Sequence, residues 1–496
     1  MNFMKKTFIL LTVLLILLAA ACENPDKSGS AGNSNSPENP DDSGDLNSAG
    51  DPAGKSLYED DLPEMDFKGG PFKILHFPAF TNAHGYLWTA EETGDVINDA
   101  IYKANSNTAA RFNLSFEENI CPAFGDVPGL LKKSTAAGDN AYDYLMMADR
   151  DAFALAMEGK YFHTVDELPH VNLDKAYWDQ SLRKAASIGN KLYFAYGANM
   201  LSVYDFSAVM LFNKKIVEDL TLGNIYALVK DGKWTIDKMT EMAKTATADI
   251  NGDGVMGADD RYGIPSRGDY FYASFWVCDR IPLVAKDQND ALHFNIPGNE
   301  KLFGIFAKLH EISTSGYIWE TTGGTDPAME MFSKGNALFF SSTTYTTLRL
   351  RGMEIDYGII PYPTLEEKKP GEPYSARAMS GFPVLIPAAS DPVRGSAVIE
   401  SLACEYQKNV IPAYYDNAVQ IKATRDEESI EMIDMLLTNK YLDLGDTLWA
   451  IDLRNEYVGL FTSKKGDTVQ SFTEKITPKF EETLQKAMKD FQTAGE

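Results

Sequence analysis

The sequence predicts an α/β protein with two lobes. The part that follows an N-terminal tether begins near Leu57 and holds roughly 440 residues, more than one hydrophobic core usually contains. Two short apolar runs, FKILHF at 72–77 and YDYLMMA at 142–148, suit buried strands. Between them, NDAIYKANSNTAARF carries Ile101 and Ala104 at helical spacing with the preceding Ile97. A strand, a helix and a strand in this order favour a βαβ unit in an α/β lobe.

The first 21 residues have the layout of a bacterial export signal. MNFMKK is basic, residues 8–18 are apolar, and three alanines precede Cys22. The apolar run is too short for a comfortable membrane span. Alanines directly before a cysteine resemble the lipobox of bacterial lipoproteins, with a mild departure because Ala19 stands where leucine is usual. The resemblance implies that Cys22 is acylated; the alternative is an ordinary secreted protein with an unrelated cysteine.

The composition of residues 22–60 predicts a flexible acidic linker. Serine, glycine, asparagine, proline and aspartate dominate residues 23–56, without an aromatic side chain. Such a segment buries too little apolar surface to offset the entropy of ordering it. With the lipid on Cys22, this linker would hold residues 61–496 near the outer face of a membrane that they need not touch.

Charge and motifs exclude several classes of function. The chain has 71 acidic and 46 basic residues and a net charge of −25, which argues against a nucleic-acid partner. It shows no nucleophile elbow, zinc-protease helix, phosphate loop or dinucleotide fingerprint. Three cysteines besides Cys22 allow either one disulfide and a free thiol or three buried thiols. We therefore expect a protein that is not an enzyme.

DINGDGVMGADD, residues 249–260, has the spacing of a calcium loop. Oxygen ligands would come from five positions, and Gly254 falls where the loop turns sharply. These predicted calcium ligands are Asp249, Asn251, Asp253, Asp260 and the backbone carbonyl of Val255. Aspartate at the last position departs from the usual glutamate, and Gly257 offers no side chain. The alternative is a bare turn held by Asx hydrogen bonds.

The flanks of this loop predict a helix before it and a strand after it. Thr235 is suited to cap a helix from Ile236 to about Ala248, with Trp234 and Met239 at the spacing of a hydrophobic staple. RYGIPS at 261–266 reads as the start of a strand. Because the loop links a helix to a strand and not two helices, a structural role for the ion is favoured over a sensor role. Dockerin modules carry a similar loop but in two copies, whereas one is present here.

An ordered set of segments resembles a known family. These segments are GNKLYFAYG (189–197), VMLFNKKIVEDL (209–220), YALVKDGKWTIDKM (226–239), DRYGI (260–264), MFSKGNALFF (331–340), DYGIIPYP (356–363), SGFPVLIPAAS (380–390) and RDEESIEMIDMLL (425–437). Together with the lipoprotein start, they are similar to extracellular solute-binding proteins of bacterial ABC importers, of the family 1-like, carbohydrate-binding type. The resemblance covers residues 70 to 450.

The resemblance implies a type II periplasmic-binding-protein-like fold. Residues 61–496 would form two discontinuous α/β lobes joined by crossing hinge strands, which we place near residues 204–212 and 345–358. A lipid-anchored monomer at the extracellular face of the cell membrane would capture a carbohydrate between the lobes, with an oligosaccharide as the favoured ligand. It would deliver the sugar to the permease subunits of an ABC transporter.

Aromatic side chains beside polar groups are the candidates for sugar contacts, because rings stack on sugar faces and polar groups bind hydroxyls. These candidates are Trp88, Glu91, Tyr204, Asp205, Trp276, Trp319, Tyr345, Tyr414 and Trp449. Two alternatives remain: a surface-anchored carbohydrate-active enzyme, and a receptor of the same fold for a peptide or an anionic ligand. Arg349, Arg351 and Arg377 are available for an anion.

Overall fold

The computed structural model describes residues 58–77, 87–266, 268–321, 325–350, 352–379, 381–420, 427–462 and 468–493. The predicted signal peptide, the acylation of Cys22 and nearly all of the linker lie outside these ranges. In the described part, no helix combines the length and the apolar character needed to cross a membrane.

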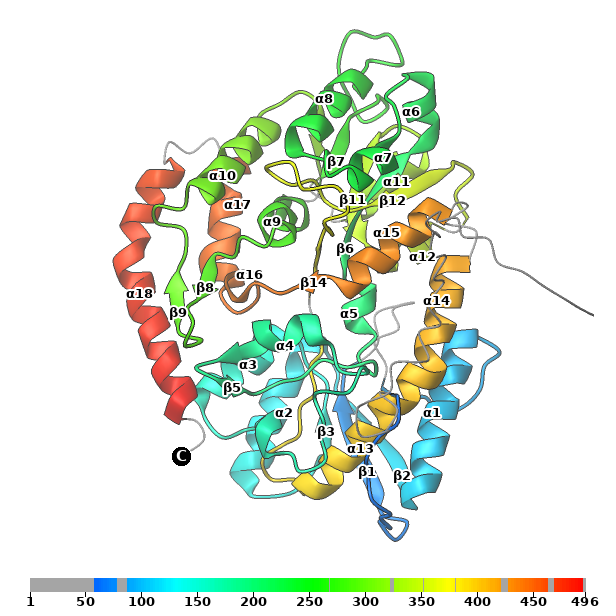
Figure 1. Ribbon diagram of the computed structural model, residues 1–496, viewed down its shortest axis with the longest axis vertical. Helices are drawn as coiled ribbons and strands as arrows, with labels where there is room; N and C mark the ends of the chain where they lie inside the picture. Colours follow the sequence, from blue (N-terminus) through cyan, green and yellow to red (C-terminus); the bar gives the residue numbers. More distant parts are fainter. Residues whose placement is uncertain are drawn as a thin grey trace, which may run out of the picture. The chain divides into compact units, whose positions relative to one another are not determined.

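The first lobe is built on a parallel sheet in the order β2-β1-β3 (Figure 1). β1 (Pro71–His76) lies between β2 (Ser115–Ile120) and β3 (Tyr144–Leu145). The predicted strand, helix and strand are confirmed. The sequence pattern did not predict β2, because SFEENI is an edge strand with four polar residues and no buried position.

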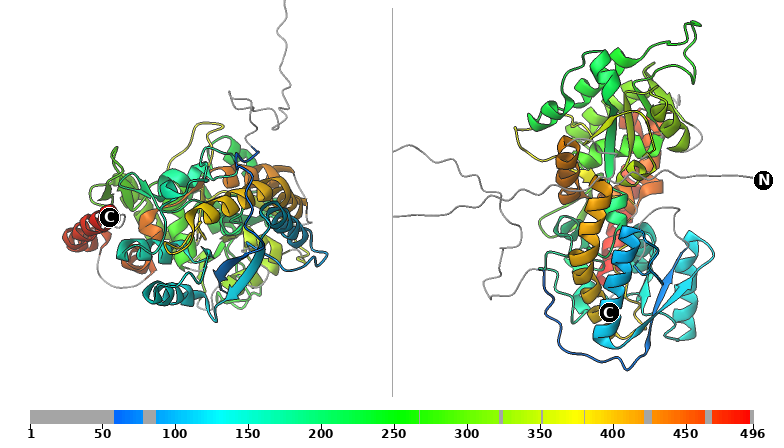
Figure 2. Two further views of the ribbon diagram at one scale, coloured as in Figure 1. Left: turned by 90° about the horizontal axis from the view of Figure 1, so that it is seen from below. Right: turned by 90° about the vertical axis from the view of Figure 1, so that its right-hand side faces the viewer.

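Helix α1 (Val96–Phe112) covers this sheet together with segments from far along the chain. Asp95 caps it by accepting hydrogen bonds from two backbone N–H groups, and Asn113 ends it in a left-handed conformation with φ 48°. Its neighbours are α13 (Pro392–Glu405) and α14 (Ile411–Gln420), which run beside it in Figure 2. The first lobe is therefore discontinuous in sequence.

The second lobe is built on a sheet in the order β11-β6-β12, with β6 (Ala208–Asn213) antiparallel to both neighbours. Every residue of β6 is buried, as expected for a strand covered on both faces. β11 spans Phe339–Thr343 and β12 spans Tyr357–Ile360, and α15 (Glu427–Thr438) packs on β12. A parallel pair, β7 (Ile264–Ser266) and β10 (Ile318–Glu320), lies beside β11.

The predicted helix before the calcium-like loop is confirmed as α8 (Ile236–Ala246). The Thr235 side chain accepts a hydrogen bond from the N–H of Lys238 at 3.3 Å. Trp234 and Met239 are both fully buried, as the staple spacing predicted. The strand predicted after the loop is β7.

The remaining elements complete the two lobes and the segments around them. The other helices are α2 (Val127–Ala137), α3 (Asp149–Glu158), α4 (Gln180–Ala186), α5 (Ser202–Asp205), α6 (Lys214–Asp219), α7 (Ile225–Lys230), α9 (Gly268–Cys278), α10 (Glu300–Ser313), α11 (Thr325–Ser333), α12 (Thr344–Arg349), α16 (Leu444–Thr447), α17 (Asn455–Thr462) and α18 (Val469–Thr493). The other strands are β4 (Ser187–Ile188), β5 (Lys191–Leu192), β8 (Val284–Lys286), β9 (Leu292–Phe294), β13 (Ala376–Arg377) and β14 (Lys440–Tyr441).

Three chain segments cross between the two sheets side by side. Ser207 forms a β-bridge with Ala378, and the N–H of Ala378 donates to the carbonyl of Tyr441 at 2.9 Å. The chain then continues to Leu385, whose carbonyl accepts a hydrogen bond from Leu145 of β3. The crossing expected within 204–212 is found at the start of that range. The one expected at 345–358 is wrong, because those residues form α12 and enter β12 inside the second sheet.

Cys121, Cys278 and Cys404 are free and buried. Of the two alternatives for the cysteines, the structure has three buried thiols. Burial raises the pKa of Cys278 to about 12 and that of Cys404 to about 11, so both remain protonated at neutral pH.

Candidate functional site

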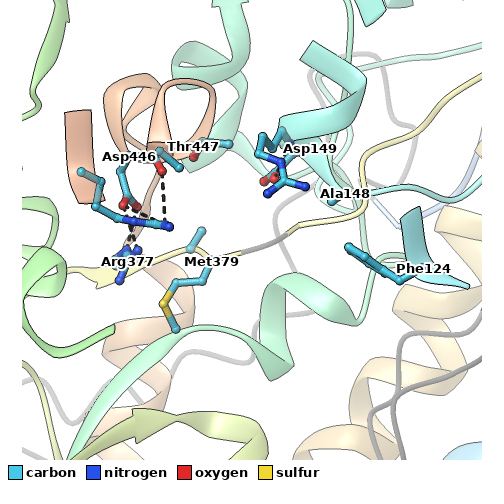
Figure 3. A pocket seen from close by; sticks show the side chains of 11 residues that line it. Phe124, Ala148, Asp149, Arg377, Met379, Asp446 and Thr447 are labelled. Carbon is cyan, nitrogen blue, oxygen red and sulfur yellow. Dashed lines mark hydrogen bonds and ion pairs between the residues drawn. The ribbon is translucent and has the colours of Figure 1, made fainter. Parts of the chain in front are cut away.

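A cavity of about 190 Å³ lies where the crossing segments meet the first lobe (Figure 3). Four parts of the chain line it: the segment after β2, the segment after β3, the end of β13 with the crossing segment that follows it, and α16 with the π-helical segment Ala450–Arg454. Its lining residues are Phe124, Ala148, Asp149, Arg150, Arg377, Ala378, Met379, Asp446, Thr447, Ala450 and Arg454.

The position of the cavity follows from the parallel sheet. Parallel strands bring their carboxyl ends to one edge, and ligands of open α/β sheets bind outside that edge. Phe124 follows β2, and Asp149 follows β3 at the first residue of α3. Two segments 25 residues apart in sequence therefore meet at one wall of the cavity.

A buried ion pair forms the opposite wall. Arg377 donates from Nε to one oxygen of Asp446 at 2.6 Å and from Nη2 to the other at 2.8 Å (Figure 3). Both side chains are at most 4% exposed. Nη1 of Arg454 lies 3.5 Å from the Asp446 carboxylate, so two guanidinium groups face this single carboxylate. Two parallel N–H···O bonds give such a pair a fixed geometry.

Asp149 is buried at the edge of the cavity. One carboxylate oxygen accepts the N–H of Arg150 at 2.8 Å and the other accepts the N–H of Gly381 at 3.0 Å. Gly381 permits this approach, because a Cβ at that position would lie 2.7 Å from the ring of Tyr196. Burial raises the pKa of Asp149 to about 7, and the charge of Asp446 acts in the same direction.

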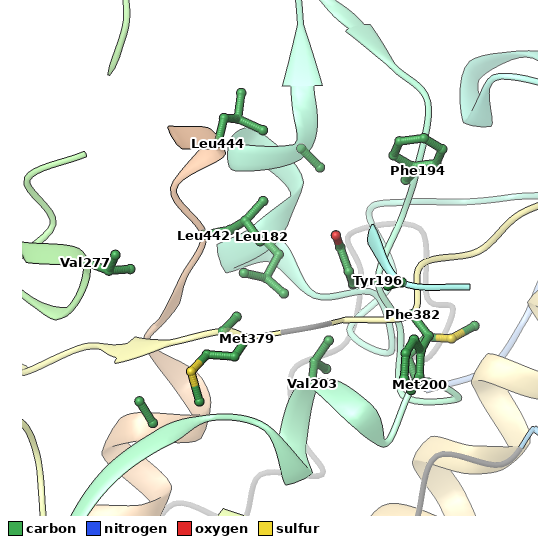
Figure 4. Packing of buried hydrophobic residues seen from close by; sticks show 14 of the residues in the cluster. Leu182, Phe194, Tyr196, Met200, Val203, Val277, Met379, Phe382, Leu442 and Leu444 are labelled. Atoms are coloured by element: carbon green, nitrogen blue, oxygen red, sulfur yellow. The ribbon is translucent and has the colours of Figure 1, made fainter. Parts of the chain in front are cut away.

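A row of aromatic rings extends from the cavity toward the second lobe. The ring centroid of Phe124 is 6.3 Å from that of Phe382, which is 6.4 Å from that of Phe206. The ring of Phe206 lies 6.1 Å from that of Tyr345. Phe382 in this row is fully buried (Figure 4), while Phe124, Phe206 and Tyr345 are partly exposed. Partly exposed rings in a row are suited to contact the flat face of a sugar.

None of the nine ligand candidates from the sequence lines the cavity. Tyr345 ends the aromatic row. Tyr204, Asp205 and Tyr414 lie together beside the crossing segments. There the hydroxyl of Tyr414 donates to Asp205 at 3.0 Å, and the ammonium of Lys440 lies 4.7 Å from the Tyr204 ring centroid. These contacts give that group a structural role.

The tryptophan candidates are spread over the molecule. Trp276 is fully buried in α9 with its ring against Phe306, and Trp449 is buried against Phe480. Trp319 is partly buried in β10. Trp88 is partly buried against the large core cluster, and Glu91 is exposed. Trp449 comes nearest in sequence to the cavity, directly before the lining residue Ala450.

The three arginines that the sequence offered for an anionic ligand also lie in different places. Arg377 lines the cavity, whereas Arg349 pairs with Asp326 at 2.8 Å elsewhere in the second lobe, and Arg351 lies outside the described residues. The motifs used in the sequence analysis did not point to Phe124, Asp149, Asp446 or Arg454. A usable signal existed for Asp149, which directly follows the apolar strand of a predicted βαβ unit.

The loop at residues 249–260 is held by side chain to backbone hydrogen bonds. The two carboxylate oxygens of Asp249 accept the N–H groups of Gly252 and Gly254, and Asp260 accepts those of Ile250 and Gly257. Both glycines adopt positive φ, 76° and 81°. These are the contacts of the bare-turn alternative. Among the described residues, no group of three or more His, Cys, Asp or Glu side chains is placed to hold a metal ion, and calcium stays a prediction.

Comparisons with known proteins give matches in structure only. No family model matches the sequence, and neither does any curated protein. The sugar-binding protein MalE from Xanthomonas citri superposes with a TM-score of 0.57 at 13% identity, over 85% of this chain and 99% of that one. An ABC substrate-binding protein from Listeria monocytogenes in complex with cycloalternan gives 0.52 at 13% identity, over 85% and 99%.

UgpB from Mycobacterium tuberculosis in complex with glycerophosphocholine gives a TM-score of 0.53 at 13% identity, over 84% of this chain and 98% of that one. The chain has the type II fold of ABC substrate-binding proteins. The fold expected from the sequence segments is thereby confirmed, and these solved neighbours extend over nearly their whole lengths in the comparison.

Proposed function

We propose that this chain is the extracellular substrate-binding component of a bacterial ABC importer and that its ligand is a carbohydrate. The observation that supports this proposal most strongly is the place of the cavity. It lies at the carboxyl edge of a parallel sheet and beside three crossing segments, in a fold shared with sugar-binding proteins. Crossing segments of this kind act as a hinge, so a ligand that contacts both sides favours the closed state.

The lining residues offer the chemistry that a sugar needs. Asp149, Asp446 and the hydroxyl of Thr447 bind sugar hydroxyl groups, and the ring of Phe124 covers an apolar face. Binding and closure complete the task, with no bond made or broken. The permease subunits then receive the sugar from the closed protein.

The anchor and the loop complete the proposal. Acylated Cys22 holds the protein as a monomer at the outer face of the membrane, and residues 22–60 act as its linker. The loop at 249–260 binds Ca²⁺ through Asp249, Asn251, Asp253, Val255 and Asp260. Its support is the spacing of oxygen ligands and the two glycine turns with positive φ.

Thermal unfolding of residues 58–496 against a panel of mono- and oligosaccharides tests the proposal. A ligand at 100 times its Kd stabilises the folded state by about 2.7 kcal/mol, which raises the midpoint of a chain this long by about 3 °C. Phe124→Ala should remove most of that shift, whereas Phe303→Ala on α10, a partly buried ring outside the cavity, should keep it.

Recovery of the sugar decides between receptor and enzyme. A receptor returns the glycan intact after incubation, whereas the surface-anchored enzyme alternative releases shorter products. Absence of a shift with every sugar, accompanied by a shift with peptides, would replace the carbohydrate with a peptide ligand.

A further inference from the structure

The cavity carries the opposite charge balance to the whole chain. The sequence has 71 acidic residues against 46 basic ones, but the lining has three guanidinium groups, on Arg150, Arg377 and Arg454, against the carboxyl groups of Asp149 and Asp446. The lining residues taken alone therefore carry at least one net positive charge, with Asp151, outside the lining, paired with Arg150. A neutral ligand gives no electrostatic reason for this reversal.

Arg377 and Arg454 differ in how many of their N–H donors are bound to the Asp446 carboxylate. Arg377 gives Nε and Nη2 to the Asp446 carboxylate, and its Nη1 lies 3.4 Å from the hydroxyl of Ser274. Arg454 donates from Nε to the side chain of Asn455 at 3.0 Å, and its Nη1 reaches the backbone carbonyl of Asp446 at 3.4 Å and the Asp446 carboxylate at 3.5 Å. Its Nη2 has no hydrogen-bond partner among the described residues, and its side chain is 21% exposed. Arg454 thus keeps donors for a ligand.

Arg150 supplies a second cation on the opposite wall. Its Nε and Nη2 reach one oxygen of Asp151 at 3.0 Å, and the side chain is 49% exposed. An exposed pair of this kind is weak and is readily exchanged for a ligand anion. Asp149, which also lines the cavity, opposes an anion only partly at neutral pH, because burial keeps a fraction of it protonated.

We propose that the ligand is an anionic sugar, whose carboxylate or phosphate binds Arg454 and Arg150 while its hydroxyls contact Asp149 and Asp446. This inference rests on the proposed function and names the substrate class of the same site. Guanidinium groups recognise planar carboxylates and phosphates through paired N–H donors. The cavity volume of about 190 Å³ lies below the 300–1,000 Å³ of drug-sized sites and favours one or two sugar rings.

Calorimetric titration of residues 58–496 with matched sugars tests the inference. The probes are D-glucuronate, D-galacturonate and glucose 6-phosphate, each compared with D-glucose or D-galactose, together with the corresponding disaccharides. We expect at least one anionic probe to bind ten-fold or more tightly than its neutral counterpart. The advantage should shrink at high salt, since screening weakens exposed charge interactions. A carboxylate and a phosphate source are distinguished by which probe binds.

Charge-removing variants locate the effect. Arg454→Gln should weaken binding of the anionic probe at least ten-fold and leave a neutral sugar nearly unchanged. Arg150→Gln, at a half-exposed side chain that the fold tolerates, provides the second variant. Arg349→Gln, which removes a guanidinium group paired with Asp326 outside the cavity, should have no effect.

Two failures are distinguishable. Neutral sugars that bind as tightly as the anionic probes, with no loss in Arg454→Gln and Arg150→Gln, would overturn the anionic ligand and keep the sugar receptor. Absence of binding by every sugar, neutral or anionic, would overturn the proposed function together with this inference.

Discussion

The cavity and the calcium-like loop shift the pKa of a buried aspartate in opposite directions. Asp149 in the cavity is buried with two backbone donors, and its pKa rises to about 7. Asp260 in the loop accepts N–H groups from Gly257, Ile250 and Asn251, and the hydrogen bond from Gly257 leads the causes that lower its pKa. The loop therefore favours the charged carboxylate of Asp260, as a cation site requires. The cavity favours the neutral carboxyl group of Asp149, as an anionic ligand requires.

The buried ion pair should give the largest effect on stability. Asp446→Ala leaves the guanidinium of Arg377 buried without its carboxylate, and removing one partner of such a pair costs about 3–5 kcal/mol. Equilibrium urea unfolding measures the change. The control is Glu366→Ala, which breaks an exposed pair with Lys301 and should cost at most about 1 kcal/mol. Equal losses in the two variants would contradict the structural role of the cavity pair.

Calcium should have the next largest effect, and only through the loop. At 100 times its Kd, a bound ion adds about 2.7 kcal/mol to the free energy of unfolding. We expect calcium to raise the unfolding midpoint of the wild type and of Arg454→Gln, and chelation to reverse the rise. Asp249→Ala should abolish it, whereas Asp231→Ala at an exposed aspartate should not. A calcium response that survives Asp249→Ala would place the ion elsewhere.

The pH dependence of stability should separate Asp149 from Asp260. Because the pKa of Asp149 is raised in the folded state, folding binds a proton below pH 7, and this contribution to stability is lost as pH rises from about 4 to 7. Asp149→Asn should remove about 2 kcal/mol of that loss between pH 5 and pH 7.

Asp260→Asn is the matched comparison. The pKa of Asp260 is lowered, so its contribution is present above about pH 4 and is lost only as pH falls below that value. The pH slope between 5 and 7 should therefore equal that of the wild type. Urea unfolding at both pH values gives the slopes, and a changed slope in Asp260→Asn with none in Asp149→Asn would reverse the comparison.

Local patterns in the sequence predicted local structure well. The cap at Thr235 and the βαβ unit each depend on residues close in sequence, and both are present, while Trp234 and Met239 at the staple positions are both buried. The edge strand β2 escaped prediction because its polar residues carry no apolar signal.

The cavity could not be predicted because its parts are joined only by folding. Phe124, Asp149, Arg377 and Asp446 come from four segments, and nothing near Asp446 in sequence marks it as the partner of Arg377, 69 residues away. Aromatic side chains were a poor guide for a similar reason. Trp276 and Trp449 serve the core, and their sequence context does not separate stacking on a ligand from packing on Phe306 or Phe480.

The most direct test of the account is the affinity of Thr447→Val for the best glycan found by thermal unfolding. This change removes one hydroxyl from the cavity wall at nearly constant volume, in a side chain with no hydrogen-bond partner among the described residues. If the cavity holds the sugar, calorimetry should show a Kd roughly ten-fold higher with an unchanged unfolding midpoint of the free protein. An unchanged Kd in Thr447→Val, together with one in Phe124→Ala, would show that the sugar binds elsewhere.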